Sequence, residues 1–241
     1  MIITVISPTF NVEDEIQKSL QSVSIQSYSG FEYLIQDGGS EDGTREVVKE
    51  YCDQDQRFKL YVENDAGIYD AMNKAIEKAN GDYCIFLGAG DRLYDSYTLE
   101  KVVRNLENKT PDIIYGYVVE ENPDGTEREY KEKLDMWYTV KFRPVCHQAI
   151  IAKTELLRDR PFDITYRIAA DQDWLLCMKK KRKIIKYIDI PIAYYPRDGV
   201  SSSPEGGVLF IKEKKNIQKT YYPVRWFFYN TYFELKKQIM K

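Results

Sequence analysis

The chain has 241 residues, of which 43% are hydrophobic and 30% charged, and this composition is typical of a soluble globular protein with one sizeable core. The formal net charge of −3 argues against general nucleic-acid binding, which favours a strongly basic surface. We find no apolar run long enough to cross a bilayer and no secretory leader, and the four cysteines are widely separated. These features predict a cytoplasmic protein with reduced cysteines.

Short apolar runs alternate with amphipathic segments in the first part of the chain. Strands are predicted at about 2–6, 31–36, 58–62 and 83–87, and helices at about 12–27, 43–51 and 70–80. The inward face of the third helix is predicted to carry Ile68, Met72, Ala75, Ile76 and Ala79. This alternation indicates a parallel sheet with helices covering both faces.

The second part of the chain has a looser pattern. Helices are predicted at about 97–106, 171–180, 207–219 and 224–240, and strands at about 112–119, 126–133, 145–152 and 184–190. Asn122-Pro123-Asp124-Gly125 is typical of a hairpin turn, Pro191 is expected to end the last strand, and 197–207 is expected to be a loop. No linker separates the two parts, so we expect one α/β domain.

The apolar run at 83–87 is followed by Gly88-Ala89-Gly90-Asp91. In open α/β sheets, ligands bind at the carboxyl ends of the strands. A carboxylate delivered there suits a divalent cation that keeps phosphate oxygens and waters among its ligands. Gly and Asp are also ordinary turn residues, so this segment alone leaves a metal site and a simple β-turn equally open.

Six motifs occur in a fixed order along the chain. They read SPTFN at 7–11, IQDGGSEDGT at 35–44, ENDAGIYDAMNKAI at 63–76, the strand ending at Asp91, CHQAI at 146–150 and AADQDWLL at 169–176. Together they resemble glycosyltransferase family 2. The resemblance implies a GT-A type α/β fold: a Rossmann-like, mostly parallel sheet flanked by helices, with a mixed acceptor-side half and C-terminal helices.

The same resemblance implies roles for individual residues. Asp171 is expected to be the general base and Asp91 the metal ligand. The residues expected to bind the nucleotide and donor are Pro8, Thr9, Asp37, Asp65, Asn73, Gly90, His147, Gln148 and Arg197. The family usually has a second acid beside Asp37 and another beside Asp91, and a Glu before Asp171. Here Gly38, Gly90 and Ala170 occupy the neighbouring positions.

Structural roles remain open for several of these residues. Asp37 can hold its loop as an Asx turn, and Asn73 can brace a helix. His147, the only histidine, can bind the metal or a phosphate, or be a satisfied structural residue. We expect Asp70 to cap a helix rather than to catalyse, and Asp173 to be structural or to orient the acceptor.

The predicted function is inverting transfer of a sugar from a nucleotide-diphosphate sugar, chiefly a UDP-sugar, with Mg²⁺ or Mn²⁺ as cofactor. The expected acceptor is a saccharide or lipid-linked saccharide of bacterial surface polysaccharide synthesis. The expected organisation is a transferase domain at 1–204, divided into a nucleotide-sugar half at 1–118 and an acceptor half at 119–204, followed by a helical extension at 205–241.

Residues 221–241 are basic and aromatic, and they fit a peripheral membrane contact, packing on their own domain or a homodimer contact. Two other functions compete with the transferase. A catalytically silent sugar-nucleotide-binding subunit of an assembly complex is kept open by the missing acids. A sugar-1-phosphate nucleotidylyltransferase is disfavoured, because SPTFN lacks the Gly-rich, basic loop that such an enzyme needs.

Overall fold

The computed structural model describes residues 1–107, 110–122, 124–134, 144–196, 203–224, 226, 227 and 231. Its strands are β1 (Ile3–Thr9), β2 (Phe31–Asp37), β3 (Phe58–Val62), β4 (Tyr83–Phe86), β5 (Arg92–Leu93), β6 (Ile113–Glu121), β7 (Glu127–Tyr130), β8 (Ile150–Lys153) and β9 (Ile185–Pro196). Its helices are α1 (Glu13–Ser24), α2 (Thr44–Gln54), α3 (Ile68–Lys78), α4 (Thr98–Glu107), the 3₁₀ helix η1 (His147–Ala149), α5 (Thr154–Asp159), α6 (Ala170–Lys180) and α7 (Pro204–Tyr221).

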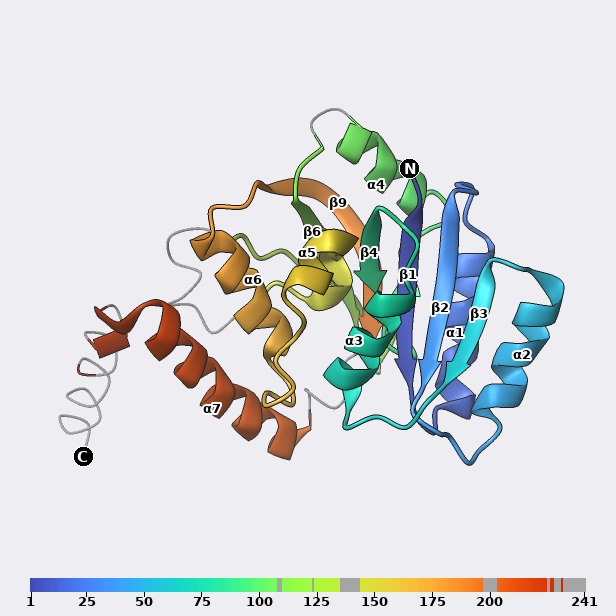
Figure 1. The fold of residues 1–241 in the computed structure, drawn as a ribbon, viewed down its shortest axis with the longest axis horizontal. Coiled ribbons are helices and arrows are strands. Elements are labelled where there is room, and N and C mark those ends of the chain that lie inside the picture. Colours follow the sequence, from blue (N-terminus) through green and yellow to red (C-terminus); the bar gives the residue numbers. More distant parts are fainter. Residues whose placement is uncertain are drawn as a thin grey trace.

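One sheet joins both parts of the chain (Figure 1), with the strand order β3-β2-β1-β4-β8-β6-β9-β5 and with β7 paired to β6. The first four strands are parallel, as predicted. The second part is mixed, because β8 is antiparallel to both β4 and β6 whereas β9 is parallel to β6. The α/β class and the parallel first half are therefore confirmed.

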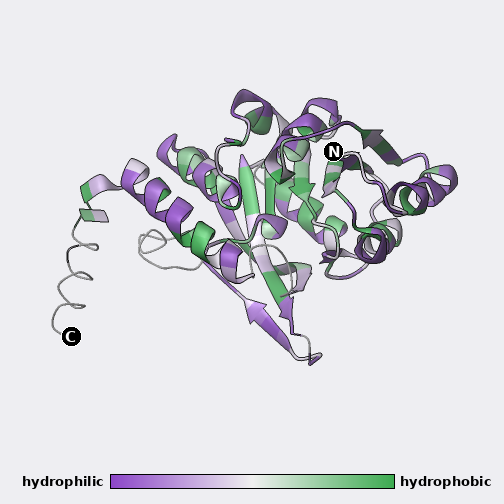
Figure 2. Ribbon diagram, turned by 90° about the horizontal axis from the view of Figure 1, so that it is seen from below, coloured by the Kyte–Doolittle hydropathy of each residue, from purple (hydrophilic) through white to green (hydrophobic). Residues whose placement is uncertain are grey.

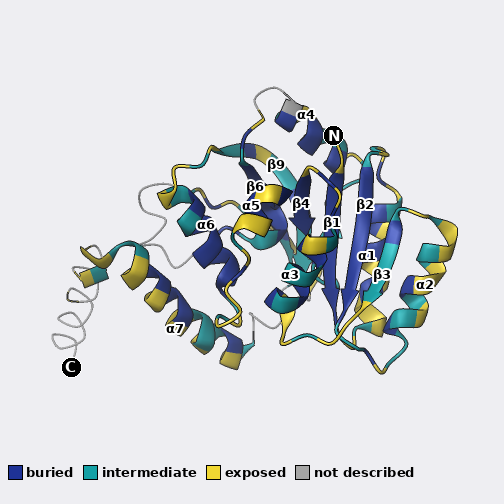
Figure 3. Ribbon diagram, in the orientation of Figure 1, coloured by how far each residue is buried: buried dark blue, intermediate teal, exposed yellow. Residues whose placement is uncertain are grey.

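Helices cover both faces of the sheet. Successive strand residues point to opposite faces, so Ile3 and Val5 pack with α1 and α4, whereas Ile6 packs with α3 and α6. Figure 3 shows β1 and β2 as buried along their length, and the hydropathy colouring in Figure 2 places apolar residues inside and polar ones on the outer helix faces. The near-continuous apolar strands follow from this two-sided cover.

Two prolines lie inside strands, which corrects two predicted strand ends. β1 continues through Pro8 to Thr9 because β4 pairs with β1 only as far as Ile6, so only β2 pairs with β1 at Pro8. β9 continues past Pro191 because the β6–β9 register shifts on both sides of the Tyr117–Pro191 pair, a bulge at which proline is tolerated.

Other boundaries also differ from the predictions. The expected strand at 145–152 begins only at β8, since His147–Ala149 forms η1, and the return strand shortens to β7. α5 and β5 were not predicted. α7 begins at Pro204 because the Ser203 side chain accepts a hydrogen bond from the Gly206 amide, a typical N-cap, so 203–207 is not a loop. Residues 197–202 and most of the predicted helix at 224–240 lie outside the described residues.

The predicted inward face of α3 is wrong at one position. Ile68 is 42% exposed, whereas Tyr69 is buried with Met72 and Ile76. Tyr69, Met72 and Ile76 are spaced i, i+3 and i+7 and share one helix face, while Ile68 lies in the first turn, where side chains point back toward the preceding loop. No helix in the described ranges combines the length and the apolar character needed to cross a bilayer.

Candidate active site

The parallel strands β1, β2 and β4 end at one edge of the sheet. Thr9 lies opposite Asp37 in the register of β1 and β2, and β4 leads into the turn at 88–91. Pro8 is buried at this edge. The structure therefore brings together three of the motifs that are far apart in the sequence, at the edge where α/β sheets bind ligands.

The Asp37 carboxylate is occupied by hydrogen bonds within the protein. Oδ1 accepts from the amides of Gly39 (3.0 Å) and Ser40 (2.8 Å), and Oδ2 accepts from the hydroxyls of Ser40 (2.6 Å) and Thr9 (3.1 Å). A carboxylate has about four acceptor positions, and these donors fill them. The Asx-turn role left open for Asp37 is thus present, while its contact with a nucleotide stays a prediction.

Gly38 provides space for a second acid that comes from another loop. A Cβ built on Gly38 would lie 2.5 Å from Oδ2 of Asp65 and 3.4 Å from the Phe10 ring. Oδ1 of Asp65 accepts from the Gly67 amide at 2.9 Å, and in the described part of the chain Oδ2 has no hydrogen-bond partner. Phe10 is 60% exposed at the same corner. An aromatic face and a carboxylate oxygen thus lie side by side at the sheet edge.

The turn after β4 delivers Asp91 in a fixed orientation. Asp91 as a whole residue is only 4% exposed, and its Oδ2 accepts from the Gly88 amide and from Nε2 of Gln148, both at 2.9 Å. A Cβ on Gly88 would lie 2.7 Å from that oxygen, and Gly90 has φ +87°, so both glycines are needed for this turn. The Ser19 hydroxyl donates to the Asp91 carbonyl at 2.6 Å and ties the turn to α1.

Asp171 lies in a buried polar cluster at the start of α6. Its Oδ1 accepts from the Tyr69 hydroxyl at 3.0 Å, and its Oδ2 accepts from Nε2 of Gln172 at 3.1 Å and lies 3.9 Å from Nδ1 of His147. The Tyr69 hydroxyl also lies 2.7 Å from the Ile168 carbonyl. Two predicted site residues, Asp171 and His147, therefore meet here with Tyr69, which comes from a third motif.

The two ionisable groups of this cluster have shifted pKa values. Burial raises the pKa of the Asp171 carboxyl, and the neighbouring His147 and the donors Gln172 and Tyr69 oppose that shift. Burial lowers the pKa of His147, with the Asp171 charge acting in the opposite direction. Burial therefore favours the neutral form of the His147 imidazole. Its Nε2 is buried and has no hydrogen-bond partner among the described residues.

Three further predicted residues have structural contacts. Asn73 makes two 2.9 Å hydrogen bonds with the Phe162 backbone and braces α3, as the alternative interpretation proposed; its donor contact stays a prediction. Asp70 lies in the first turn of α3, where an acid favours the helix dipole, and it accepts from the Ala66 amide in the preceding loop; the N-cap Gly67 has no side-chain cap hydrogen bond. Asp173 pairs with Arg160 at 2.7 Å. Arg197 lies outside the described residues.

The residues present fit an incomplete cation site. Across the described ranges, no group of three His, Cys, Asp or Glu side chains is arranged to hold a metal ion. Gln148, the residue after His147, nevertheless donates a hydrogen bond to Asp91, so Asp91 and His147 lie in neighbouring parts of the site. Nε2 of His147 is buried there. A hard cation can take its remaining ligands from phosphate oxygens and water, so such a site would depend on the nucleotide.

Comparison with known proteins identifies the chain. The sequence profile described as Glycosyl transferase family 2 matches residues 4–178. The chain belongs to glycosyl transferase family 2. This family 2 enzyme is 30% identical, over 213 residues, to the PGL/p-HBAD biosynthesis glycosyltransferases of Mycobacterium tuberculosis and Mycobacterium bovis, which covers 87% of the chain and 82% of those proteins. The prediction of a glycosyltransferase is confirmed.

Solved structures support the fold. S. aureus TarS 1–349 in complex with UDP-GlcNAc superposes with a TM-score of 0.68 at 21% identity, covering 92% of this chain and 71% of that one. The Pyrobaculum calidifontis mannosyltransferase PcManGT with GDP-Man and Mn²⁺ gives 0.65 at 20% identity, covering 82% and 58%. Glucosyl-3-phosphoglycerate synthase of Mycobacterium tuberculosis with Mn²⁺ and UDP gives 0.62 at 13% identity, covering 90% and 78%. The predicted GT-A fold of the family 2 chain is confirmed.

Sequence reasoning missed three residues of this site. Phe10 follows Thr9 in SPTFN and its exposure was not foreseen. Tyr69 and Gln172 both donate to Asp171. Tyr69 lies within a motif that carries the family resemblance, and Gln172 lies between Asp171 and Asp173, so the sequence marked both positions. Only the folded chain shows that their side chains contact Asp171.

We expect Tyr69→Phe to raise the pKa of Asp171 further, because the lost hydroxyl stabilises the charged carboxylate. A hydrogen bond to a charged group contributes about 1.5 kcal/mol, which corresponds to a shift of about one pH unit. The titration midpoint of the Asp171 carboxyl carbon, followed by NMR, measures the shift. Tyr83→Phe, which removes a buried hydroxyl bonded to the Pro111 carbonyl, is the control. An unchanged midpoint in Tyr69→Phe would contradict the assignment.

Proposed function

We propose that the enzyme is an inverting transferase that uses a nucleotide-diphosphate sugar and has Asp171 as its general base. The observation that carries the proposal is the buried Asp171 carboxylate with a raised pKa, beside His147. A general base works best when its pKa approaches the working pH, and burial moves a carboxylate in that direction. Asp171 takes the proton of the acceptor hydroxyl, whose oxygen attacks the anomeric carbon while the bond to the diphosphate breaks and the diphosphate leaves with the electron pair.

Phe10 and Asp65 form the base-recognition corner in this proposal. A nucleobase can stack on the exposed face of Phe10, and Oδ2 of Asp65 can accept from a ring N–H. Uracil and guanine both present such a donor. We choose UDP because TarS and glucosyl-3-phosphoglycerate synthase were crystallised with uridine nucleotides, although PcManGT was crystallised with GDP-Man. Asp65 thus supplies the acid that Gly38 lacks.

Asp91 and Nε2 of His147 are the residues that would hold Mg²⁺ or Mn²⁺ here. With Nδ1 facing Asp171, a neutral imidazole that carries its proton on Nδ1 leaves the Nε2 lone pair as an acceptor. A bound cation would neutralise charge that develops on the departing diphosphate. Gln148 fixes the Asp91 carboxylate through a 2.9 Å hydrogen bond. PcManGT and glucosyl-3-phosphoglycerate synthase, both crystallised with Mn²⁺, support this part of the proposal.

The proposal divides the chain into a nucleotide-sugar half at 1–118, an acceptor half at 119–204 and an extension at 205–241. The acceptor class is a saccharide or lipid-linked saccharide in polysaccharide or glycoconjugate synthesis. The names of the mycobacterial PGL/p-HBAD biosynthesis enzymes and of a teichuronic acid biosynthesis enzyme of Bacillus subtilis, which is 36% identical over 107 residues (44% of this chain and 41% of that protein), support this class.

The surface of the extension at 205–241 is suited to a peripheral contact with an anionic membrane. Val208, Ile211, Lys212 and Lys215 are exposed on α7 at i, i+3, i+4 and i+7, so they form one stripe, and Val208 is 71% exposed. The basic end of α6 lies beside the end of α7, since Lys180 Nζ is 4.6 Å from the centroid of the Tyr222 ring. Mixed apolar and basic side chains are typical of a helix at a lipid interface.

We expect Asp171→Asn to lower kcat by about 10²–10⁴-fold, because the transition state loses its proton acceptor while the donor contacts remain. Transfer and slow donor hydrolysis are measured with the purified enzyme, and donor affinity is measured by calorimetry. Asp53→Asn, an exposed acid on α2, is the control. Full turnover in Asp171→Asn would exclude Asp171 as the base. Donor binding by the wild type with neither transfer nor hydrolysis would instead favour a silent binding subunit, an alternative kept open by the single acid at Asp91.

We expect UDP with Mn²⁺ to raise the melting temperature more than either component alone, since the cation site needs the diphosphate. Asp91→Ala should remove the metal-dependent part, and Asp65→Asn should weaken stabilisation by nucleotides with or without metal. Asp82→Asn, an acid at the opposite edge of the sheet, is the control. Stabilisation by GDP but not by UDP would overturn the choice of uracil as the nucleobase. Unchanged nucleotide stabilisation in Asp65→Asn would overturn the proposed base-recognition corner.

We expect the protein to co-sediment with vesicles rich in phosphatidylglycerol but not with phosphatidylcholine vesicles. Lys212→Glu combined with Lys215→Glu should weaken this binding several-fold, because each basic residue near an anionic surface contributes about 1 kcal/mol. Lys18→Glu with Lys49→Glu on α1 and α2 is the matched control. No vesicle binding, together with a concentration-dependent dimer in ultracentrifugation, would replace the membrane contact by a homodimer.

A further inference from the structure

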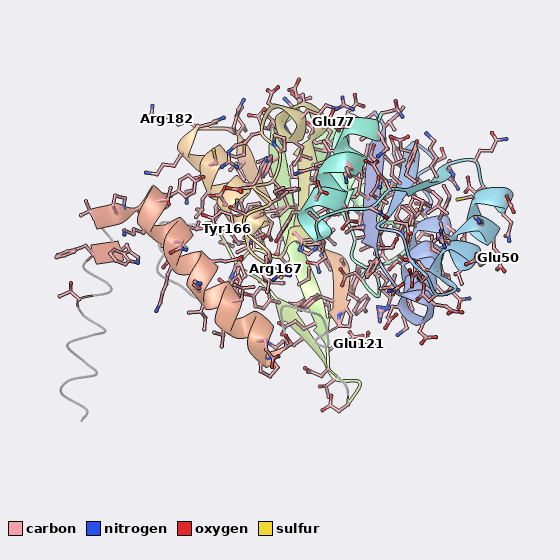
Figure 4. All side chains as sticks on the ribbon, turned by 60° about the horizontal axis from the view of Figure 1, so that its bottom comes forward. Glu50, Glu77, Glu121, Tyr166, Arg167 and Arg182 are labelled. Carbon is pink, nitrogen blue, oxygen red and sulfur yellow. The ribbon has the colours of Figure 1, made fainter. Side chains whose placement is uncertain are left out.

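Glu213 is a buried acid on α7 whose carboxylate binds three successive backbone amides. Oε1 accepts from the Arg167 amide at 2.8 Å, and Oε2 accepts from the amides of Ile168 and Ala169, both at 3.0 Å. The Glu213 side chain is only 6% exposed. Figure 4 shows Arg167 on the segment that runs alongside α7.

These three amides lie at the N-terminus of the helix that carries Asp171. α6 begins at Ala170, and its N-cap, Ala169, has no side chain that could accept a hydrogen bond. All three amides precede the first helical residue, and the last of them belongs to the N-cap itself. The Glu213 carboxylate therefore binds the turn that leads into α6, and it comes from a helix that begins more than thirty residues later in the chain.

The same segment is held from its other side by Tyr69. The Tyr69 hydroxyl lies within hydrogen-bond distance of both the Ile168 carbonyl and Asp171 Oδ1. Ile168 is thus fixed at its amide by Glu213 and at its carbonyl by Tyr69, two residues before Ala170 and three before Asp171.

We propose that Glu213 is a positioning residue for Asp171: it does not touch the substrates, but it fixes the turn at 167–169 and so sets where the Asp171 carboxylate meets the acceptor. The inference rests on the proposed role of Asp171 as general base. It places a contribution to catalysis on α7, beyond residues 4–178 that the family profile matches.

Two variants test the inference against a matched control. Glu213→Gln keeps one acceptor oxygen and Glu213→Ala keeps none, whereas Glu205→Gln changes an exposed acid in the first turn of the same helix. We expect kcat to fall roughly 10- to 100-fold in Glu213→Ala, less in Glu213→Gln and not at all in Glu205→Gln, since small displacements of a reacting group have effects of this size. The donor KM should stay unchanged.

A double variant separates positioning from general stability. If Glu213 acts through Asp171, adding Glu213→Gln to Asp171→Asn should lower kcat no further, because coupled residues are not additive. Hydrogen exchange at the amides of 167–169 should quicken in Glu213→Gln, and this measurement does not depend on what Asp171 does. Faster exchange with wild-type kcat, or a full additional loss in the double variant, would overturn the inference. Full activity of Asp171→Asn alone would refute the role of Asp171 as general base. The exchange measurement would then still test whether Glu213 holds the turn at 167–169.

Discussion

β4 pairs with β8 in antiparallel register from Tyr83 opposite Lys153 to Ile85 opposite Ile151, and this pairing joins the parallel half of the sheet to the mixed half. η1 directly precedes β8, so the pairing also sets His147 and Gln148 beside the turn that follows β4. The hydrogen bond from Gln148 to Asp91 depends on that arrangement. A change in the β4–β8 register would move the histidine and the acid apart, whatever the rest of the sheet did.

Small residues decide where the carboxylates of the site can lie. Gly88 lets the Asp91 carboxylate fold back onto its own turn, and Gly38 leaves room for Asp65 to lie against the end of β2. A carboxylate from one loop thus lies in the space beside Gly38 of another. The departure of the Asp-Gly sequence from the family pattern therefore does not mean that this corner of the site lacks a carboxylate.

Much of the fold could be predicted because its signals are local. Apolar runs and helical periodicity identified the first four strands and their helices, and the motifs at the strand ends identified the edge that carries Asp91 and Asp37. Some of the errors have long-range causes. β9 passes Pro191 because Gly116 of β6 lets the two backbones approach, since a Cβ on Gly116 would meet the Ile190 carbonyl oxygen. No local pattern around Pro191 reports the glycine on the neighbouring strand.

The sequence motifs could propose residues for the site but could not give the contacts between them. Asp171 could be proposed from its motif, yet Tyr69, which donates to its carboxylate, lies 102 residues away in the sequence. Glu213, which binds the turn before α6, lies 44 residues from the N-cap Ala169. Asp37 was expected to bind a ligand or hold a loop, and only the four donors around its carboxylate show that the second role is present. Side-chain burial on α3 failed at Ile68 because a first-turn residue has no preceding turn to pack against.

α7 binds the turn before α6, so one contact of the segment that carries Asp171 lies outside residues 4–178, which the family profile matches. A chimera that took only residues 4–178 into another transferase would inherit Asp91, His147 and Asp171 but would leave the amides of 167–169 without their acid. On the proposed roles of Asp171 and Glu213, such a graft would turn over poorly. Recombination between relatives of this enzyme should therefore succeed at junctions that keep α6 and α7 from the same parent.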